Sequence, residues 1–223
     1  MKVAISGTYS TGKTTTALAL SYLTGIPNTH AKTMREILPS ALPGKKLEEV
    51  SMPELVQLGI RRLINRCVAE DKFDEFISDG SSLHEWAYGL ARTEIGLHPG
   101  KNELSDPKTM KIFKEVMQNF GAVAKDHALS NYDVFVHLPI EFPLKMDGHR
   151  PVSEEFRRQA SDTLLEALES LKIPYIIVGG SVEERLLKIV NYYKLPRVMS
   201  IERAVDMAQK EISSFRLAKE ESK

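Results

Sequence analysis

The chain has 223 residues, with 30 basic and 30 acidic side chains that cancel to a formal net charge of zero. This length allows one large domain, or a domain with a small appendage, whose core needs no disulfide or structural metal. The balanced charge gives no overall field toward nucleic acid or acidic membranes, and Cys67, the only cysteine, excludes an internal disulfide. No apolar run approaches the length of a membrane span. The first predicted strand begins almost at residue 1, so no cleaved leader is expected, and the expectation is a cytoplasmic protein.

The first predicted strand, residues 3–5, leads into a glycine-rich loop from Gly7 to Thr14 that matches the Walker A pattern G-x-x-x-x-G-K-[ST]. A buried helix is predicted after it, and in this strand–loop–helix setting backbone N–H groups surround a phosphate chain. Lys13 is expected to reach the β- and γ-phosphates, and the Thr14 hydroxyl to ligate Mg²⁺. The predicted nucleotide contacts in this loop are Gly7, Ser10, Thr11, Gly12, Lys13, Thr14 and Thr15. The loop predicts a nucleoside triphosphate site; the alternative is a glycine turn that carries a lysine.

Strand and helix alternate along the rest of the chain, which predicts a parallel sheet with helices on both faces. The first helix should end near Leu23, because Gly25 favours a left-handed cap. Further strands are predicted at residues 26–29, 76–79, 134–138 and 175–178. Further helices are predicted at residues 33–38 and 51–70, after residues 82, 106, 153 and 181, and beyond residue 196. Pro39 is expected in a loop, and Gly121 is a possible kink.

Three capping boxes, Ser51-x-x-Glu54, Ser82-x-x-Glu85 and Ser181-x-x-Glu184, mark predicted helix starts. In the first of these helices, apolar residues recur at helical spacing and predict an apolar face; they are Leu55, Ile60, Leu63, Ile64, Cys67 and Val68. The last helix, within residues 196–223, is amphipathic and is expected to pack on the body of the protein.

Asp79 is the second chemical signal, because a carboxylate at the C-terminal end of a core strand lies on the edge where parallel sheets bind ligands. It is expected either to hold Mg²⁺ through water or to accept the proton of an attacking hydroxyl. The alternative is a helix-capping aspartate, since Ser81, Ser82 and Glu85 follow at once.

Three arginines, Arg150, Arg157 and Arg158, flank the start of the helix after Ser153. Phosphoryl transfer gains from cations placed where charge spreads over the transferred group, so Arg150 and Arg157 are candidate catalytic residues. Arg157 and Arg158 differ by about 100° around the helix axis, and Arg158 is expected on a solvated face. The scattered histidines have no partners at metal-ligand spacing, so no zinc site is expected.

Together these residues resemble the P-loop kinases of the nucleoside and nucleotide kinase group, and most closely small AAA-type domains similar to the ribosylnicotinamide kinase domain. The shared features are Gly7–Thr14, Arg35-Glu36, Asp79 with Ser81, Asp147-Gly-x-Arg150, and Gly179-Gly180. The resemblance implies a five-stranded parallel sheet of order 2-3-1-4-5, ATP as donor with Gly180 beside it, and a lid arginine. It also implies a kinase domain over residues 1–195 with its lid around 140–158.

Two positions depart from that family. Such kinases often carry Asp-Arg-Ser where this chain has Asp79-Gly80-Ser81, and often a glutamate where it has Lys32. Lys32, Arg35 and Ser81 are therefore the candidate acceptor-side residues, and a lysine suits an acceptor that already bears phosphate or a nucleic acid backbone.

The favoured function is ATP-dependent, Mg²⁺-assisted phosphoryl transfer to a nucleoside, a nucleotide or a similar small molecule. Three alternatives stay open: a kinase acting on a modified base or an end of nucleic acid, a regulatory GTPase, and a mechanical or chaperone ATPase. A regulatory GTPase would carry an [NT]-K-x-D motif, which this sequence does not contain. A mechanical or chaperone ATPase would carry Asp-Glu at the end of a strand, where this chain has Asp79-Gly80. The acceptor, the oligomeric state and the pathway are not predicted.

Overall fold

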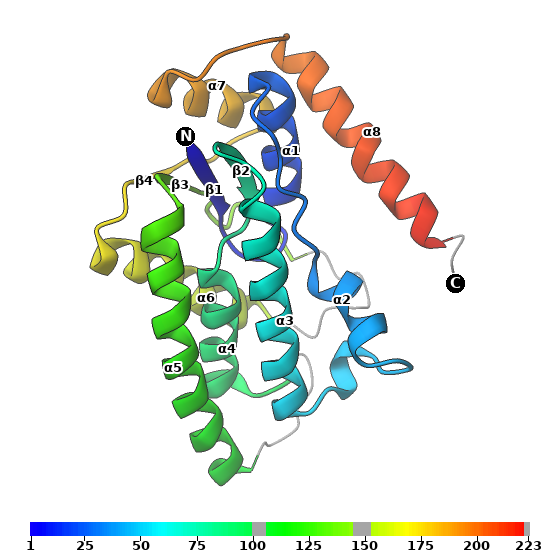
Figure 1. Cartoon of the computed structure of the whole chain (residues 1–223), viewed down its shortest axis with the longest axis vertical. Helices are drawn as coiled ribbons and strands as arrows, with labels where there is room; N and C mark the ends of the chain where they lie inside the picture. Colours follow the sequence, from blue (N-terminus) through cyan, green and yellow to red (C-terminus); the bar gives the residue numbers. More distant parts are fainter. Residues whose placement is uncertain (100–105, 145–152, 221–223) are drawn as a thin grey trace.

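The computed structural model describes residues 1–99, 106–144 and 153–220, with side chains to residue 214 (Figure 1). Its parallel sheet has the order β2-β1-β3-β4. The strands are β1 (Lys2–Ser6), β2 (Phe76–Asp79), β3 (Val134–His137) and β4 (Tyr175–Ile177). The helices are α1 (Lys13–Thr24), α2 (Met34–Ala41), the 3-10 turn η1 (Leu47–Glu49), α3 (Met52–Glu70), α4 (Leu83–Ile95), α5 (Pro107–Asn131), α6 (Glu154–Leu171), α7 (Val182–Tyr193) and α8 (Ile201–Glu220).

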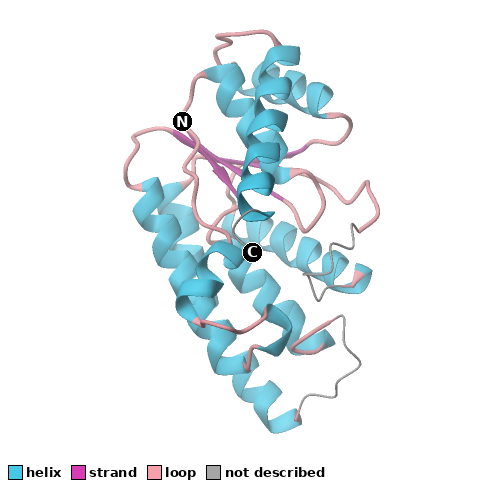
Figure 2. Ribbon diagram, turned by 90° about the vertical axis from the view of Figure 1, so that its right-hand side faces the viewer, coloured by secondary structure: helices cyan, strands magenta, loops and turns pink. Residues whose placement is uncertain are grey.

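Helices cover both faces of the sheet, as Figure 2 shows. Successive strand residues point to opposite faces, so in β1 Val3 and Ile5 join a core with α1, α7 and α8, while Ala4 joins a second core with α4, α5 and α6. The carboxyl ends of β1 and β2 lie side by side, because Ile5 pairs with Asp79. The loops that follow these two strands therefore share one edge of the sheet.

The prediction of five strands is wrong: the described part of the chain forms four, although their order agrees with the predicted one. The segment predicted as the missing edge strand makes an isolated parallel bridge between Asn28 and Ile77. Pro27 lacks an N–H group and accepts one hydrogen bond from Ile77, and His30 has a left-handed φ of 49°. These two residues limit the pairing to a bridge.

The apolar face predicted for α3 is also partly wrong. Ile60, Ile64 and Val68 are 44%, 57% and 56% exposed. The buried face of the helix instead carries Arg66 and Glu70, which are bound in a polar network with Ser78 and Tyr132 of neighbouring elements. An apolar pattern cannot reveal a buried face built from paired charges.

Pro39 lies inside α2 rather than in a loop. Its neighbours Ile37 and Leu38 are buried against α3, and that packing offsets the hydrogen bond that proline cannot make. The capping boxes at Ser51 and at Ser181 are confirmed, as is the cap at Gly25.

α8 lies along α1 and α7, with Ala204, Val205 and Ala208 buried in their shared core. Tyr22 of α1 donates a hydrogen bond to Glu211 of α8 at 2.6 Å. Figure 1 shows α8 beside α1 on the side of the sheet away from α5. Among the described residues, no helix is both long and apolar enough to cross a membrane.

Gly121 does not kink α5, which is one helix from Pro107 to Asn131. Its role is close packing, because a methyl group at Gly121 would overlap the Trp86 indole, with Cδ1 at 2.7 Å. Gly59 of α3 is the opposite case: it is buried, yet a methyl group there would meet no described atom within 4 Å.

We therefore expect opposite effects from two alanine substitutions. Gly121→Ala should destabilise the protein by about 1–3 kcal/mol, because the rigid indole must shift. Gly59→Ala should stabilise it by up to about 1 kcal/mol, through helix propensity. Urea unfolding of both variants measures this; equal effects would contradict the packing described here.

Candidate active site

The loop between β1 and α1 has the backbone of an anion-binding site. Ser10 and Gly12 adopt left-handed φ angles of 61° and 89°, so neighbouring N–H groups turn toward one concave side. Gly7 has φ 133°, and a methyl group there would lie 2.7 Å from the Leu138 carbonyl oxygen. Glycine is required at this position because the loop passes so close to the chain after β3.

Side chains of the loop and of three distant helices donate hydrogen bonds to the loop's carbonyl oxygens. The pairs are His84 Nε2 with Gly7 O at 3.0 Å, Lys13 Nζ with Thr8 O at 2.6 Å, Arg157 Nε with Tyr9 O at 3.0 Å, and Arg185 Nη1 with Thr11 O at 2.7 Å. In a trans peptide the carbonyl and the next N–H point in opposite directions. Because donors outside the loop hold its carbonyls away from the concave side, the N–H groups of the same peptides face that side.

Asp79 lies beside the phosphate loop, where the Thr14 hydroxyl donates to its carboxylate at 2.5 Å. The residue at the N-cap of α4 is Ser82, and the contact of Asp79 with Thr14 favours a site role over helix capping. A hydroxyl and a carboxylate are hard oxygen ligands that suit Mg²⁺, which keeps several waters and uses few protein ligands. Within the described ranges there is no group of three or more His, Cys, Asp or Glu side chains that could hold a metal ion.

His84 is a site residue that the sequence analysis missed. It is buried, its Nδ1 accepts the Ser81 N–H at 2.9 Å, and its Nε2 lies 3.0 Å from the Gly7 carbonyl oxygen. Burial, with a contribution from the charge of Lys13, holds the pKa of His84 well below its ordinary value. A neutral ring can accept on one side and donate on the other, so it links the loop after β2 to the phosphate loop. A histidine in the first turn of a helix gives no sequence signal for such a role.

The capping box predicted at Ser82 is absent. Its hydroxyl donates to the Ala124 carbonyl, and Glu85 forms an ion pair with Arg62 instead. Ser81, a predicted acceptor-side residue, is buried, and its hydroxyl lies 3.0 Å from His84 Nδ1. These contacts make the start of α4 part of the wall of the site.

Arg157 is fully buried, and its guanidinium donates hydrogen bonds to three groups: the Tyr9 carbonyl, the Glu154 carboxylate and the Phe142 carbonyl. The structure thus brings it to the phosphate loop, as a backbone anchor. Arg158 is exposed on α6, as expected. Arg150 and the centre of the predicted lid, residues 145–152, lie outside the described residues.

The other predicted residues fall on two sides of the loop. Thr15 lies half-buried in the first turn of α1, and Gly180 follows β4, where its N–H donates to both oxygens of Glu141 at 3.0 Å. Lys32 and Arg35 are exposed around the start of α2, and the Lys32 N–H donates to Asn65.

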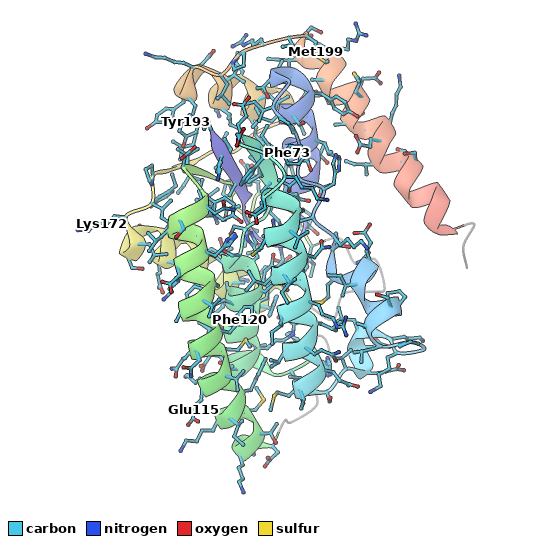
Figure 3. The ribbon with its side chains drawn as sticks, viewed as in Figure 1. Phe73, Glu115, Phe120, Lys172, Tyr193 and Met199 are labelled. Carbon is cyan, nitrogen blue, oxygen red and sulfur yellow. The ribbon has the colours of Figure 1, made fainter. Side chains whose placement is uncertain are left out.

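A narrow cavity begins at Tyr9 of the phosphate loop; its volume is about 40 Å³, and about 500 Å³ when all the empty space out to the open solvent is counted. It lies among α2, α3, α4 and α5, and Figure 3 labels Phe120 on the α5 side. Its lining is mostly aromatic and apolar and comprises Tyr9, Met34, Leu47, Leu55, Val56, Gly59, Glu85, Tyr88, Gly89, Arg92, Phe113, Met117 and Phe120. The Tyr9 and Tyr88 rings stack at 4.7 Å, and Gly59 leaves open space toward the cavity.

His137, at the end of β3, is buried between two hydroxyl groups. Its Nδ1 lies 3.3 Å from Ser6 Oγ and its Nε2 3.2 Å from Ser161 Oγ. Burial, with the nearby charge of Lys13, lowers the pKa of His137 from its ordinary 6.5 to about 4.

A phosphate-binding loop on a parallel sheet, followed by an acid on the adjacent strand, defines a P-loop nucleotide-binding domain. The chain belongs to the AAA domain family, whose model matches residues 2–185. A search of curated proteins finds no match.

Solved structures of P-loop kinases share the fold. Deoxyadenosine kinase from M. mycoides with bound dATP is 17% identical, with a TM-score of 0.61 over 87% of this chain and 99% of that one. Thymidylate kinase from Candida albicans is 18% identical, with a TM-score of 0.57 over 86% and 91%. NadR in complex with NAD and AMP-PNP is 13% identical, with a TM-score of 0.54 over 89% of this chain and 51% of that one. These likenesses confirm the expected P-loop kinase fold.

Acid should destabilise the protein through His137. Between pH about 6.5 and 4 the unfolded chain binds a proton that folded His137 does not, so stability falls as pH falls through this window. Across the whole window the free energy of unfolding falls by roughly 3 kcal/mol, which is the free-energy equivalent of the difference between the unfolded and folded pKa values. Thermal unfolding at several pH values should show that the melting temperature of His137→Asn falls less steeply with decreasing pH than that of wild type. An equally steep fall in both proteins would contradict this.

Proposed function

We propose that the protein is an ATP-dependent kinase that transfers the γ-phosphoryl group to a hydroxyl of a small nucleoside-like or nucleotide-like acceptor. One observation carries the proposal: the cavity begins at Tyr9 of the same loop that carries Lys13 and Thr14, and Thr14 donates a hydrogen bond to Asp79. A nucleotide hydrolase needs room for water alone. An apolar, aromatic cavity joined to the phosphate loop supports an organic acceptor.

In this proposal the acceptor oxygen attacks the γ-phosphorus, the bond to the β–γ bridging oxygen breaks, and ADP leaves. The loop N–H groups and Lys13 stabilise the charge on the transferred group. Asp79 accepts the proton of the attacking hydroxyl, or it takes part in holding Mg²⁺ with Thr14. Bound Mg²⁺ would neutralise charge on the β- and γ-oxygens.

The cavity's chemistry supports a flat acceptor with polar groups. The stacked rings of Tyr9 and Tyr88 supply an aromatic wall, and the ion pair of Arg62 with Glu85 offers charged hydrogen-bonding groups at the margin. Nucleosides combine a flat base with hydroxyl groups in this way. The names of two structural neighbours, a deoxyadenosine kinase and a thymidylate kinase, agree with this class.

A second candidate is an acceptor that already bears phosphate, free or at an end or base of nucleic acid. The exposed Lys32 and Arg35 favour it, because they flank in sequence Met34, which lines the cavity. Steep salt dependence of binding to a polynucleotide would support this candidate, and salt-independent binding of a nucleoside would exclude it.

Lys13→Ala should leave the fold intact and lower phosphoryl transfer by about 10²–10³ or more, since it removes a charge from the donor phosphates. ATP consumption with and without acceptor measures this, and Lys210→Ala, a surface lysine paired with Asp206, is the matched control. An active Lys13→Ala protein would refute the proposed function.

Asp79→Asn should lower kcat far more than it weakens ATP binding, because the amide keeps the shape but cannot take a proton or a full metal bond. Steady-state kinetics beside a direct ATP titration separate the two. If turnover is unchanged and only the melting temperature drops, Asp79 is a structural residue.

Gly59→Leu should raise the acceptor KM at least tenfold, because the new side chain enters the cavity, while the KM for ATP changes little. Stability should not fall, since leucine favours helix over glycine. The assay uses the acceptor that wild type phosphorylates fastest, with Ile60→Leu on the exposed face as control. An unchanged acceptor KM would show that the acceptor binds elsewhere.

A further inference from the structure

Arg185 lies at the far side of the phosphate loop from the acceptor cavity. It is on the first turn of α7, is 1% exposed, and donates through Nη1 to the Thr11 carbonyl at 2.7 Å. Its Nη2 donates to Glu141 Oε2 at 2.9 Å. One planar guanidinium thus bridges a loop carbonyl and a carboxylate from the chain after β3, with Nη1 and Nη2 each serving one partner.

Glu141 extends this connection to the turn after β4. Both of its oxygens accept the Gly180 N–H at 3.0 Å, and the Gly180 N–H, with Arg185, holds the pKa of Glu141 below its ordinary value. The carboxylate is therefore charged at neutral pH, and it fixes the direction of the Gly180 peptide.

The backbone approaches the ion pair closely at both ends, at Gly12 and at Gly179. A methyl group at Gly12 would lie 3.0 Å from Arg185 Nη1, and one at Gly179 would overlap Glu141 Oε1. The loop and the turn after β4 are thus built tightly around the same ion pair. A buried charge needs such pairing, because an unpaired guanidinium in this place would be costly.

The contact with Thr11 has a direct consequence for the nucleotide. Because the peptide between Thr11 and Gly12 is planar and trans, holding its carbonyl outward holds the Gly12 N–H inward. In phosphate loops such N–H groups cradle the phosphate chain. Arg185 can orient this donor without touching the nucleotide.

We propose that Arg185 and Glu141 are positioning residues for the donor nucleotide: together they aim the Gly12 N–H at its phosphates and tie the phosphate loop to the Gly179–Gly180 turn. The inference rests on the proposed function, since it concerns the donor side of the same site. In this inference neither Arg185 nor Glu141 contacts the acceptor.

The test is calorimetric titration of the full chain with AMP-PNP and Mg²⁺. Arg185→Met should bind at least tenfold more weakly than wild type, and Arg185→Lys should fall between them, because one ammonium cannot reproduce both arms of the guanidinium. Glu141→Gln, on a side chain that is 35% exposed, should fold and also bind more weakly. The matched control is Arg197→Met, an exposed arginine after α7, which should bind as wild type does.

The double variant Arg185→Met/Glu141→Gln should lose less affinity than the two single losses combined, because both act through one pair. If Arg185→Met does not fold, Glu141→Gln alone decides the matter. Equal binding by Glu141→Gln and wild type would overturn this inference alone. Failure of wild type to bind AMP-PNP would instead overturn the proposed function, and this inference with it.

Discussion

The orientation of the peptide groups in the loop from Gly7 to Thr14 is the constraint on which the site depends. Backbone N–H groups can face a phosphate chain only if the carbonyls of the same peptides are satisfied elsewhere. Here His84, Arg157 and Arg185, from α4, α6 and α7, supply buried donors from outside the loop. The two arginines are in turn neutralised by Glu154 and Glu141.

This constraint explains how the fold serves the site. Helices on both faces of the sheet bury its strands, and their ends at the carboxyl edge deliver the donors to one loop. The register that pairs Ile5 with Asp79 brings the acid to Thr14, and the same edge opens into the cavity at Tyr9. In the proposed reaction the donor and acceptor sides thus meet where β1 and β2 end, which is the geometry that direct phosphoryl transfer requires.

Local sequence patterns predicted the phosphate loop, the position of Asp79 at the end of a core strand, and most strands and helices, because glycine spacing, capping residues and apolar periodicity act over a few residues. They failed where long-range pairing decides. The inward face of α3 carries Arg66 and Glu70, whose burial depends on partners from β2 and α5. His84 and Arg185 gave no signal either, since their partners are backbone carbonyls far away in sequence. Arg157 was predicted at the site, but its anchoring of Tyr9 could not be read from sequence spacing.

The most direct test of phosphoryl transfer is mass analysis of products after incubation with ATP and Mg²⁺. The acceptors to screen are nucleosides, nucleoside monophosphates, nicotinamide riboside and modified-base DNA, with Lys13→Ala protein as the blank. The structure leads us to expect one class of small acceptor that gains a single phosphoryl group as ADP forms in equal amount, with neither product in the blank. Formation of ADP and free phosphate at a rate that no acceptor changes would contradict the account and identify a nucleotide hydrolase.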